Sequence, residues 1–404
     1  MPIRFDRNEF AGAFGDIGTD FSLVVGMILA AHLNVSSALI MFGLMQVLTG
    51  LTYGIPMPAQ PLKAMAVLVI AQKLSGNILF GAGLAIGVVM LLLSITGAID
   101  WLARAVPKAV IRGIQLGLGF QLALLALRDY VPGEGRYGYA LSGIAFVLVI
   151  VLMGNRRFPP ALFVIALGIA YALVFKIHFA DLAHGLGFSL PQGHLPSRSD
   201  IWTGFLLLAL PQIPLSLGNS ILATRQVTED LFPQKPLTVR KIGLTYSLMN
   251  LVNPFLSGIP TCHGSGGMVG HYTFGARTGG SVVIYGSIYL VLGLFFSRAF
   301  ATAVYLFPLP ILGVILLFEG VNLALLARDM AASRAALAVV VLTALLCIGT
   351  GTYGYVVGLV VGTAVAHLSR RNLVRITPDL DSATAAKGES AQPSDAAREA
   401  SLTR

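Results

Sequence analysis

The chain has 404 residues, of which 56% are hydrophobic and only 11% are charged, and its formal net charge is +9. A soluble globular domain carries about 25% charged residues, so this chain has too few charges to cover a water-facing surface, which excludes a soluble enzyme. Its two cysteines, Cys262 and Cys347, are too few for a disulfide scaffold or a paired-cysteine metal site. The composition therefore predicts an all-α polytopic membrane protein.

Apolar segments follow one another along most of the chain. A membrane-crossing helix needs roughly 20 mostly apolar residues. Such helices are expected near residues 10–32, 35–53, 76–99, 107–127, 138–153, 159–177, 201–223, 239–254, 281–297, 299–318, 334–349 and 352–368. Two shorter apolar segments, which follow residues 55–61 and 258–264, bring the prediction to about 14 crossings. Residues 372–404 are rich in Ser, Ala, Asp, Lys and Glu, and we expect a disordered tail there.

The basic residues give the expected orientation. With the N-terminus in the cytoplasm, most Arg and Lys residues fall in cytoplasmic segments, among them Arg104, Lys108, Arg112, Arg156 and Arg157. This asymmetry predicts a multi-pass protein of the cell membrane with both termini in the cytoplasm. Because topology explains the surplus positive charge, we expect no nucleic-acid partner.

The two halves of the chain resemble each other. Residues 122–129 (LALLALRD) recur, one residue shorter, about 200 residues later as 323–329 (LALLARD), and the interrupted segments near Pro56 and Pro260 have a similar separation. We expect a first repeat over residues 1–180 and a second over 200–370, each with seven spans and therefore of opposite orientation. Inverted repeats with a broken helix in each half are typical of secondary transporters, whose site lies near the bilayer midplane. The alternative is a pair of ordinary proline kinks.

The two breaks are expected to present helix N-termini to one ligand. Three prolines lie within residues 56–61, and they cannot all occupy a helix interior because proline lacks a backbone N–H, although Pro61 suits the first turn of a helix. In the second half, residues 264–267 (GSGG) let a ligand approach the backbone closely. Helix N-termini carry partial positive charge and free N–H groups. We therefore expect the helices after Gln60 and after His263 to meet and to form an anion site.

Four motifs resemble those of the molybdate transporter family, a branch related to the SulP sulfate permeases: residues 14–19 (FGDIGT), 56–64 (PMPAQPLKA), 262–268 (CHGSGGM) and 271–279 (HYTFGARTG). The resemblance covers nearly all of residues 8–370. It implies two inverted repeats of seven spans, a core domain from spans 1–4 and 8–11, and a gate domain from spans 5–7 and 12–14. SulP proteins usually carry a cytoplasmic C-terminal STAS domain, and the tail at residues 372–404 is too short for one, so none is expected.

The expected substrate site combines the motifs with residue chemistry. A tetrahedral oxyanion offers acceptors and no donors, so backbone N–H groups, neutral polar side chains and a lysine suit it. The substrate-binding candidates are Thr19, Gln60, Pro61, Lys63, Gln212, Ser216, Asn219, His263, Gly264, Ser265 and Gly266. Lys63 can contact the ligand or pair with Asp16 or Asp20, because a lysine within the membrane faces a partner or a cavity.

The polar positions of the eighth span allow two interpretations. Gln212, Ser216 and Asn219 share one helix face, which either lines the cavity or bonds to a neighbouring helix. His263 is likewise either a ligand or a satisfied structural group.

Two acidic residues have different expected roles. Asp16 is the expected proton-coupling group, because burial favours the neutral form of a carboxyl and because the glycines beside it allow close approach to the site. Glu319 lies in span 12, on the gate side, and is expected to pack against a polar group of a neighbouring helix.

The leading interpretation is a secondary active transporter of a tetrahedral oxyanion, molybdate first, which imports its substrate with protons by an elevator-type movement of core against gate. The alternatives are a sulfate transporter, or a nucleobase or bicarbonate permease or an anion channel on the same fold. A nucleobase site needs carboxylates, and the second break has none at residues 262–265. We expect no enzymatic activity, no cofactor and no bound metal. The expected partners are molybdate, tungstate or sulfate, protons and the lipid bilayer, and the gate surface is compatible with a homodimer.

Overall fold

The computed structural model describes residues 2–99, 101, 105–154, 159–177, 185–371 and 373. The expectations for Arg104, Arg156, Arg157 and the tail at 372–404, apart from Leu373, lie outside these residues. The described part is almost entirely helical, with one two-stranded sheet.

The first half of the chain forms helices whose ends carry the residues expected of helix caps. Asn34 and Ser75 accept backbone N–H bonds at the starts of α3 and α5, and Gly54 and Gly97 end these helices in the left-handed conformation. The elements are α1 (Arg7–Ala13), α2 (Ile17–Ala31), α3 (Val35–Tyr53), β1 (Ala59–Pro61), α4 (Lys63–Gln72), α5 (Gly76–Thr96), α7 (Lys108–Leu125), η1 (Ala126–Tyr130), η2 (Val131–Glu134), α8 (Gly135–Leu152) and α9 (Pro160–Phe175).

The second half begins with one long helix interrupted by two π-helical segments. Its elements are α11 (Arg198–Gly204), η3 (Phe205–Ala209), α12 (Leu210–Leu215), η4 (Ser216–Leu222), α13 (Ala223–Leu231), α14 (Val239–Val252), η5 (Asn253–Leu256), β2 (Thr261–His263), α15 (Ser265–Thr273), α16 (Gly280–Phe295), α17 (Ser297–Leu306), α18 (Leu309–Leu325), η6 (Leu326–Met330), α19 (Arg334–Gly349), η7 (Gly351–Tyr353) and α20 (Gly354–Arg370).

Two expected crossings have different boundaries in the structure. The segment expected at 299–318 is wrong: α17 ends at Leu306 and α18 begins at Leu309, because Pro308 disfavours helical backbone at Phe307. Helices α16 and α17 meet at an angle of 99°. The segment expected at 10–32 is divided into α1 and α2, which are bent by 43°.

The helices have the length and composition of a membrane protein. Within the described residues, six helices are long and apolar enough to cross a membrane, or up to eight when each bent pair counts as one span. Three shorter apolar helices, α4, α9 and α19, accompany them. The chain is therefore a polytopic helical membrane protein, as its composition predicts.

The two interrupted segments lie side by side as an antiparallel pair. Strand β1 pairs with β2, with Gln60 opposite Cys262. The outer edges of both strands are also satisfied: the side chain of Gln46 donates to and accepts from the backbone of Ala59, and that of Asn250 does the same at Thr261. These bonds let non-helical backbone be buried without unpaired groups. The prediction that the two breaks meet is confirmed.

Pro61 does not occupy the first turn of a helix. It is the last residue of β1 and faces Thr261, and α4 begins at Lys63 after Leu62. A proline is tolerated in the first turn of a helix, where its missing N–H would have no partner, and also on the unpaired side of a strand. The proline at position 61 is therefore compatible with either place.

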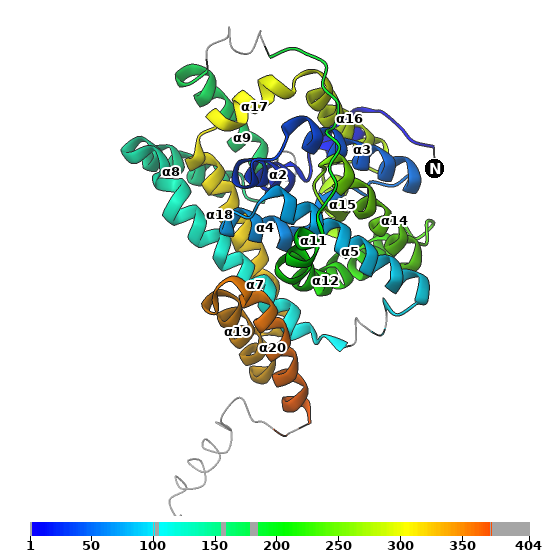
Figure 1. Cartoon of the computed structure of the whole chain (residues 1–404). Coiled ribbons are helices and arrows are strands. Elements are labelled where there is room, and N and C mark those ends of the chain that lie inside the picture. Colours follow the sequence, from blue (N-terminus) through cyan, green and yellow to red (C-terminus); the bar gives the residue numbers. More distant parts are fainter. Residues whose placement is uncertain are drawn as a thin grey trace, which may run out of the picture.

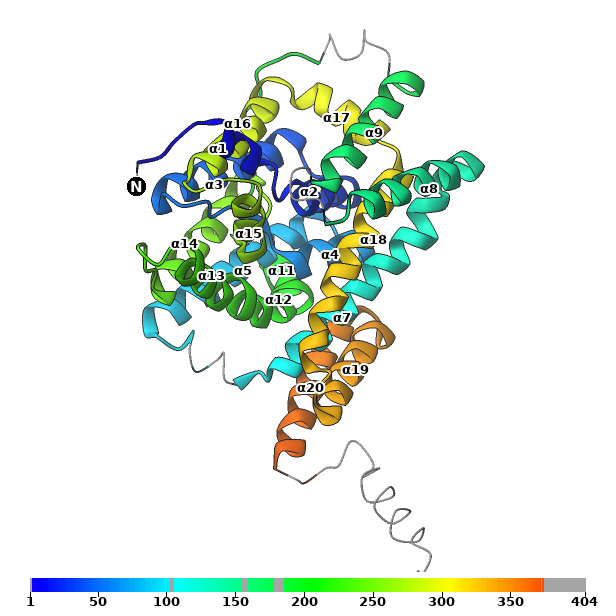
Figure 2. The same cartoon turned by 180° about the vertical axis from the view of Figure 1, so that it is seen from behind.

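The helices form two groups (Figures 1 and 2). The compact group contains α1–α5 and α11–α16, in which α3 packs on α16 and α5 packs on α14 and α11. The elongated group contains α7–α9 and α18–α20, with α7 packed against α18, α19 and α20. Figure 1 shows α19 and α20 at one end of the elongated group and α8 and α9 at the other.

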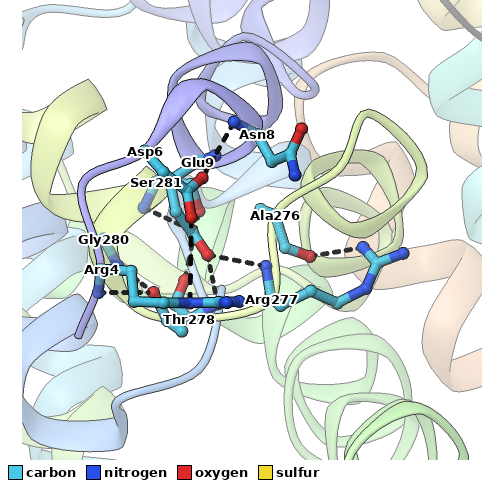
Figure 3. Close-up of polar contacts among 9 residues, drawn as sticks. All are labelled: Arg4, Asp6, Asn8, Glu9, Ala276, Arg277, Thr278, Gly280 and Ser281. Atoms are coloured by element: carbon cyan, nitrogen blue, oxygen red, sulfur yellow. Dashed lines mark hydrogen bonds and ion pairs between the residues drawn. The ribbon is translucent and has the colours of Figure 1, made fainter. Parts of the chain in front are cut away.

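A buried carboxylate fastens the N-terminal helix to the compact group (Figure 3). Glu9 of α1 has no exposed surface and accepts bonds from the backbone N–H groups of Arg277 at 3.0 Å, Thr278 at 2.8 Å and Ser281 at 3.0 Å. An anion is favoured at a helix N-terminus, and these donors lie in the first turn of α16 and in the turn just before it. Glu9 therefore fixes the turn between α15 and α16.

Candidate functional site

A cavity of about 300 Å³ lies between the two helix groups, beside the strand pair. The compact group supplies most of the wall, and the elongated group contributes Arg112 of α7, Leu323 of α18 and Leu326 of η6. The described lining residues are Gln60, Lys63, Arg112, Gln212, Leu215, Asn219, Ser220, Ala223, Cys262, His263, Ser265, Gly266, Leu323 and Leu326. This lining includes a lysine and an arginine but no carboxylate. It suits an anion.

The N-terminus of α15 opens on this cavity. Its N-cap residue, Gly264, has no side chain to accept from the first N–H groups, and no described side chain from elsewhere in the chain bonds them. Ser265 and Gly266 line the cavity. A Cβ at Gly266 would meet nothing within 4 Å, so open space lies above this backbone. The first turn of α15 therefore offers free donors and partial positive charge to a ligand.

Gly264 itself lies behind the cavity lining. A Cβ at Gly264 would overlap the side chain of Gln60, and one at Gly267 would overlap Asp16 and Pro58. These glycines let the two breaks pack closely, which is a different role from the direct ligand approach that the sequence suggests for Gly264.

The N-terminus of α4 is already occupied. The amide oxygen of Gln212 accepts from the backbone N–H groups of Ala64 at 2.8 Å and Met65 at 3.3 Å. The two helix N-termini, which the sequence treats as equivalent, therefore differ. Of the two, α15 has the open one.

Lys63 lines the cavity, and its partner is Glu319 of α18, which packs against polar groups of neighbouring helices as the sequence predicts. Its Nζ donates to Oε1 of Glu319 at 2.9 Å. The expected pairing with Asp16 or Asp20 is not the one formed. Thr19, expected in the substrate site, lies outside the cavity lining and donates to Oε2 of Glu319 at 3.2 Å.

The polar face of the long helix borders the cavity at two of its three expected positions. Gln212 and Asn219 line the cavity, whereas Ser216 is fully buried outside it. Ser216 accepts from Gln212 Nε2 at 3.1 Å and shares a hydrogen bond of 2.7 Å with the hydroxyl of Tyr246. Gln212 and Ser216 bond each other and share a face, but the bond to Tyr246 of α14 holds the Ser216 hydroxyl in the packed interface instead of the cavity.

His263 combines a structural contact with a free ring nitrogen. Its Nε2 shares a hydrogen bond of 2.7 Å with the hydroxyl of Thr245, and its ring packs edge-on against Tyr53. Its Nδ1 is buried and has no hydrogen-bond partner among the described residues. His263 borders the cavity, while its bond to Thr245 and its contact with Tyr53 are structural.

Asp16, the N-cap residue of α2, and Asp20 within α2 lie outside the cavity lining. Gln60 donates from Nε2 to Oδ2 of Asp16. Asp20 is fully buried, and neither of its carboxyl oxygens has a hydrogen-bond partner within the described residues. Neither residue belongs to the cavity lining.

Arg112 is the lining residue that sequence reasoning missed most clearly, because it was counted only among the topology-setting cations. Its guanidinium donates to both carboxylate oxygens of Asp329, at 3.1 Å and 2.7 Å, and to Gln115 at 2.9 Å. Lys108 also pairs with Asp329, at 2.8 Å. Ser220 and Cys262 are further lining residues that lie next to residues the sequence did single out.

The described residues contain no group of three or more His, Cys, Asp or Glu side chains placed to hold a metal ion. A second hollow of about 540 Å³ lies over α16 and is lined mainly by apolar residues, including Phe5, Val283 and Phe296. It lacks charged groups and does not suit an ion.

Comparison with known families places this geometry in context. The chain matches the family model described as a molybdate transporter of the MFS superfamily over residues 8–122 and 204–323. It is 32% identical to molybdate transporter 1 of Arabidopsis thaliana, over 89% of this chain and 88% of the relative. It is 33% identical to molybdate transporter 2 of the same plant, over 80% of this chain and 79% of that one. Molybdate transporter 1 of Chlamydomonas reinhardtii is 28% identical over 89% and 91% of the two chains.

The fold is similar to two solved anion-transporter structures. SLC26A9 superposes with a TM-score of 0.68 at 12% identity over 89% of this chain, which spans 65% of the length of the SLC26A9 chain. The transmembrane domain of the cyanobacterial bicarbonate transporter BicA superposes with a TM-score of 0.63 at 15% identity, over 91% of this chain and 98% of that one. At these identities, the likeness concerns the fold alone.

Proposed function

The chain belongs to the molybdate transporter family, and from this premise we propose that it is a secondary active transporter that carries molybdate across the membrane. The observation that carries this proposal is the cavity at the open N-terminus of α15, whose described lining holds Lys63 and Arg112 and no carboxylate. A dianion in a low-dielectric site needs positive charge and donors, and this lining offers both.

The chemistry of the lining favours a tetrahedral oxyanion. Molybdate has four acceptor oxygens and no donor, and it can accept from Lys63, Arg112, Ser265 and the first backbone N–H groups of α15. A nucleobase presents ring N–H groups, for which carboxylates are the strongest acceptors. The absence of an acidic side chain from the described lining speaks against a nucleobase substrate.

We further propose about 14 crossings in two inverted repeats, with both termini cytoplasmic. The bonds at the strand edges support this arrangement. Gln46 of α3 bonds the backbone of β1, and Asn250 of α14 bonds the backbone of β2 in the same way. Each of these helices is the second span of its proposed half. In this proposal the compact group is the core domain, the elongated group is the gate domain, and the core moves against the gate like an elevator. If the protein pairs as a homodimer, we place the contact on the gate.

Proton-coupled import is the proposed source of energy. A dianion that enters a negative-inside cell works against about 2.3 kcal/mol per charge per 100 mV, or roughly 4.6 kcal/mol for two charges at 100 mV. Asp16 is the proposed proton carrier because it bonds Gln60 of the cavity lining and lies beside Gly267 at the start of α15. Asp20, buried without a hydrogen-bond partner among the described residues, is the competing candidate.

Uptake into proteoliposomes tests the proposed function. Purified protein is reconstituted, and entry of radiolabelled molybdate is measured with an inward proton gradient, with tungstate, sulfate, bicarbonate and uracil as competitors. We expect saturable uptake and counterflow, both inhibited by tungstate or sulfate but not by uracil. Flux without saturation or counterflow indicates a channel. Uptake of uracil in place of molybdate overturns the proposal.

A further inference from the structure

We propose that Glu319 is a built-in competitor of the transported anion. Its carboxylate neutralises Lys63 while the cavity is empty and gives Lys63 up when an oxyanion binds. This inference rests on the proposed function and concerns the same cavity. It assigns to Glu319 a direct effect on anion affinity, which a packing role on a neighbouring helix does not include.

Glu319 bonds two groups, the hydroxyl of Thr19 and the ammonium group of Lys63. Oε1 accepts from Lys63 at 2.9 Å, and Oε2 accepts from Thr19 at 3.2 Å. The Glu319 side chain is 6% exposed, whereas that of Lys63 is 29% exposed and lines the cavity. Lysine has four rotatable stem bonds and three donors, so its ammonium group can turn from one acceptor to another.

The charges around the pair explain why an arriving anion competes for Lys63. Asp16 and Asp20 of α2 and Lys63 of α4 are the charged neighbours that interact with Glu319. Within the described residues, Lys63 is the cation in salt-bridge contact with Glu319. An empty site therefore keeps Lys63 neutralised, and a dianion must compete with the carboxylate for this charge. A tethered acid thus lowers anion affinity and eases release.

Arg112, the other cation of the lining, has a carboxylate partner that is less dependent on it than Glu319 is on Lys63. Arg112 is paired with Asp329, but Asp329 also contacts Lys108 at 2.8 Å and is 32% exposed. If Arg112 moves, Asp329 keeps a counter-charge and water. Among the described residues Glu319 then keeps Thr19 alone as a hydrogen-bond partner, so the exchange at Lys63 is the more costly of the two and has the larger effect on affinity.

A double-mutant cycle in binding tests this inference. Molybdate affinity is measured by isothermal titration of the purified full chain and of its Glu319→Gln, Lys63→Gln and doubly substituted forms. Removing the competitor should tighten molybdate binding about tenfold in Glu319→Gln, which corresponds to about 1.4 kcal/mol. In the Lys63→Gln background the second substitution should give no gain. Glu134→Gln is the matched control, since Glu134 also bonds one lysine, Lys176, and one hydroxyl, that of Tyr171. It should not change the affinity.

A stability measurement covers the case in which Glu319→Gln folds poorly because Lys63 is left unpaired. Molybdate should then replace the missing counter-charge, so its addition should raise the melting temperature more in Glu319→Gln than in the parent. Weaker or unchanged affinity in Glu319→Gln, or no extra stabilisation by molybdate, overturns the inference while leaving the proposed function intact. A parent protein that binds no oxyanion overturns both.

Discussion

Gln212 of the long helix caps the half-helix α4, with its amide oxygen 2.8 Å from the backbone nitrogen of Ala64. The N-cap residues of α4 and α15, Leu62 and Gly264, make no side-chain cap bond themselves, and among the described residues no side chain takes at α15 the place that Gln212 takes at α4. One of the two helix N-termini at the centre of the protein is therefore closed by the protein itself, and the other is left open for a ligand. The site is asymmetric even though the strands that precede the two helices pair with each other.

The cap predicts a cost in stability. Gln212→Met should keep the side-chain volume but leave the N–H groups of Ala64 and Met65 without their acceptor. Loss of a helix cap costs about 0.5–2 kcal/mol. We expect a lower melting temperature in detergent. The same melting temperature in parent and variant would show that other groups satisfy these donors.

Close packing of the two breaks predicts a strict requirement at Gly264. Gly264→Val should abolish molybdate uptake, because its side chain would overlap Gln60 and push the breaks apart. Gly349→Val is a matched control, since a Cβ there would meet nothing within 4 Å and the residue lies at the end of α19. Normal uptake by Gly264→Val, measured in proteoliposomes at equal protein content, would contradict this role.

Arg112 is predicted to contribute to anion affinity. A hydrogen bond to a charged group contributes about 1.5–3 kcal/mol, so Arg112→Gln should weaken molybdate binding roughly 10- to 150-fold. Arg225→Gln is the control, since Arg225 pairs with Glu229 and is 48% exposed. Titration calorimetry distinguishes the two. Equal affinity in parent and Arg112→Gln would remove Arg112 from the site.

Proton coupling predicts a pH response that depends on Asp16. Uptake should rise as external pH falls, since more protons are available to travel with the anion. Asp16→Asn should flatten this response while retaining some exchange of internal for external molybdate. If Asp16→Asn keeps the full response and Asp20→Asn loses it, the proton is carried by the buried carboxyl that has no hydrogen-bond partner among the described residues.

The carboxylate of Glu9 predicts a contribution to stability remote from the cavity. In Glu9→Gln an amide NH₂ group replaces one carboxylate oxygen and faces a backbone N–H donor. The charge-assisted hydrogen bond at that donor is lost. We expect a loss of about 1.5–3 kcal/mol in the free energy of unfolding. Glu229→Gln on the exposed face of α13 should have no such effect. Equal melting temperatures for both variants would show that Glu9 is dispensable.

Local composition was sufficient to predict much of the centre of this protein. The prolines near residue 56 and the glycines near residue 264 mark the breaks because neither type continues a helix well, and the polar residues beside them line the cavity. Gln60, Lys63, His263 and Ser265 could be identified for this reason.

Pairings between distant segments could not be predicted from local patterns. Glu319 lies 256 residues from Lys63, and nothing near either residue indicates which acid reaches the lysine. Ser216 was misplaced because its hydroxyl bonds Tyr246 of α14, a residue 30 positions away whose contact the helical period does not indicate. Arg112 resembles any cytoplasmic cation in the sequence, and only the packing of α7 beside the compact group brings it to the cavity.

The most direct test of an oxyanion site at the open end of α15 is isothermal titration of the purified full chain with molybdate, tungstate, sulfate and uracil. We predict saturable binding of molybdate, competition by tungstate or sulfate, and no heat of binding with uracil. The same titration with Gly266→Val should show no molybdate binding, because the new side chain enters the open space above the backbone of α15. Binding of uracil but not molybdate, or undiminished molybdate binding by Gly266→Val, would contradict an oxyanion site at this helix terminus.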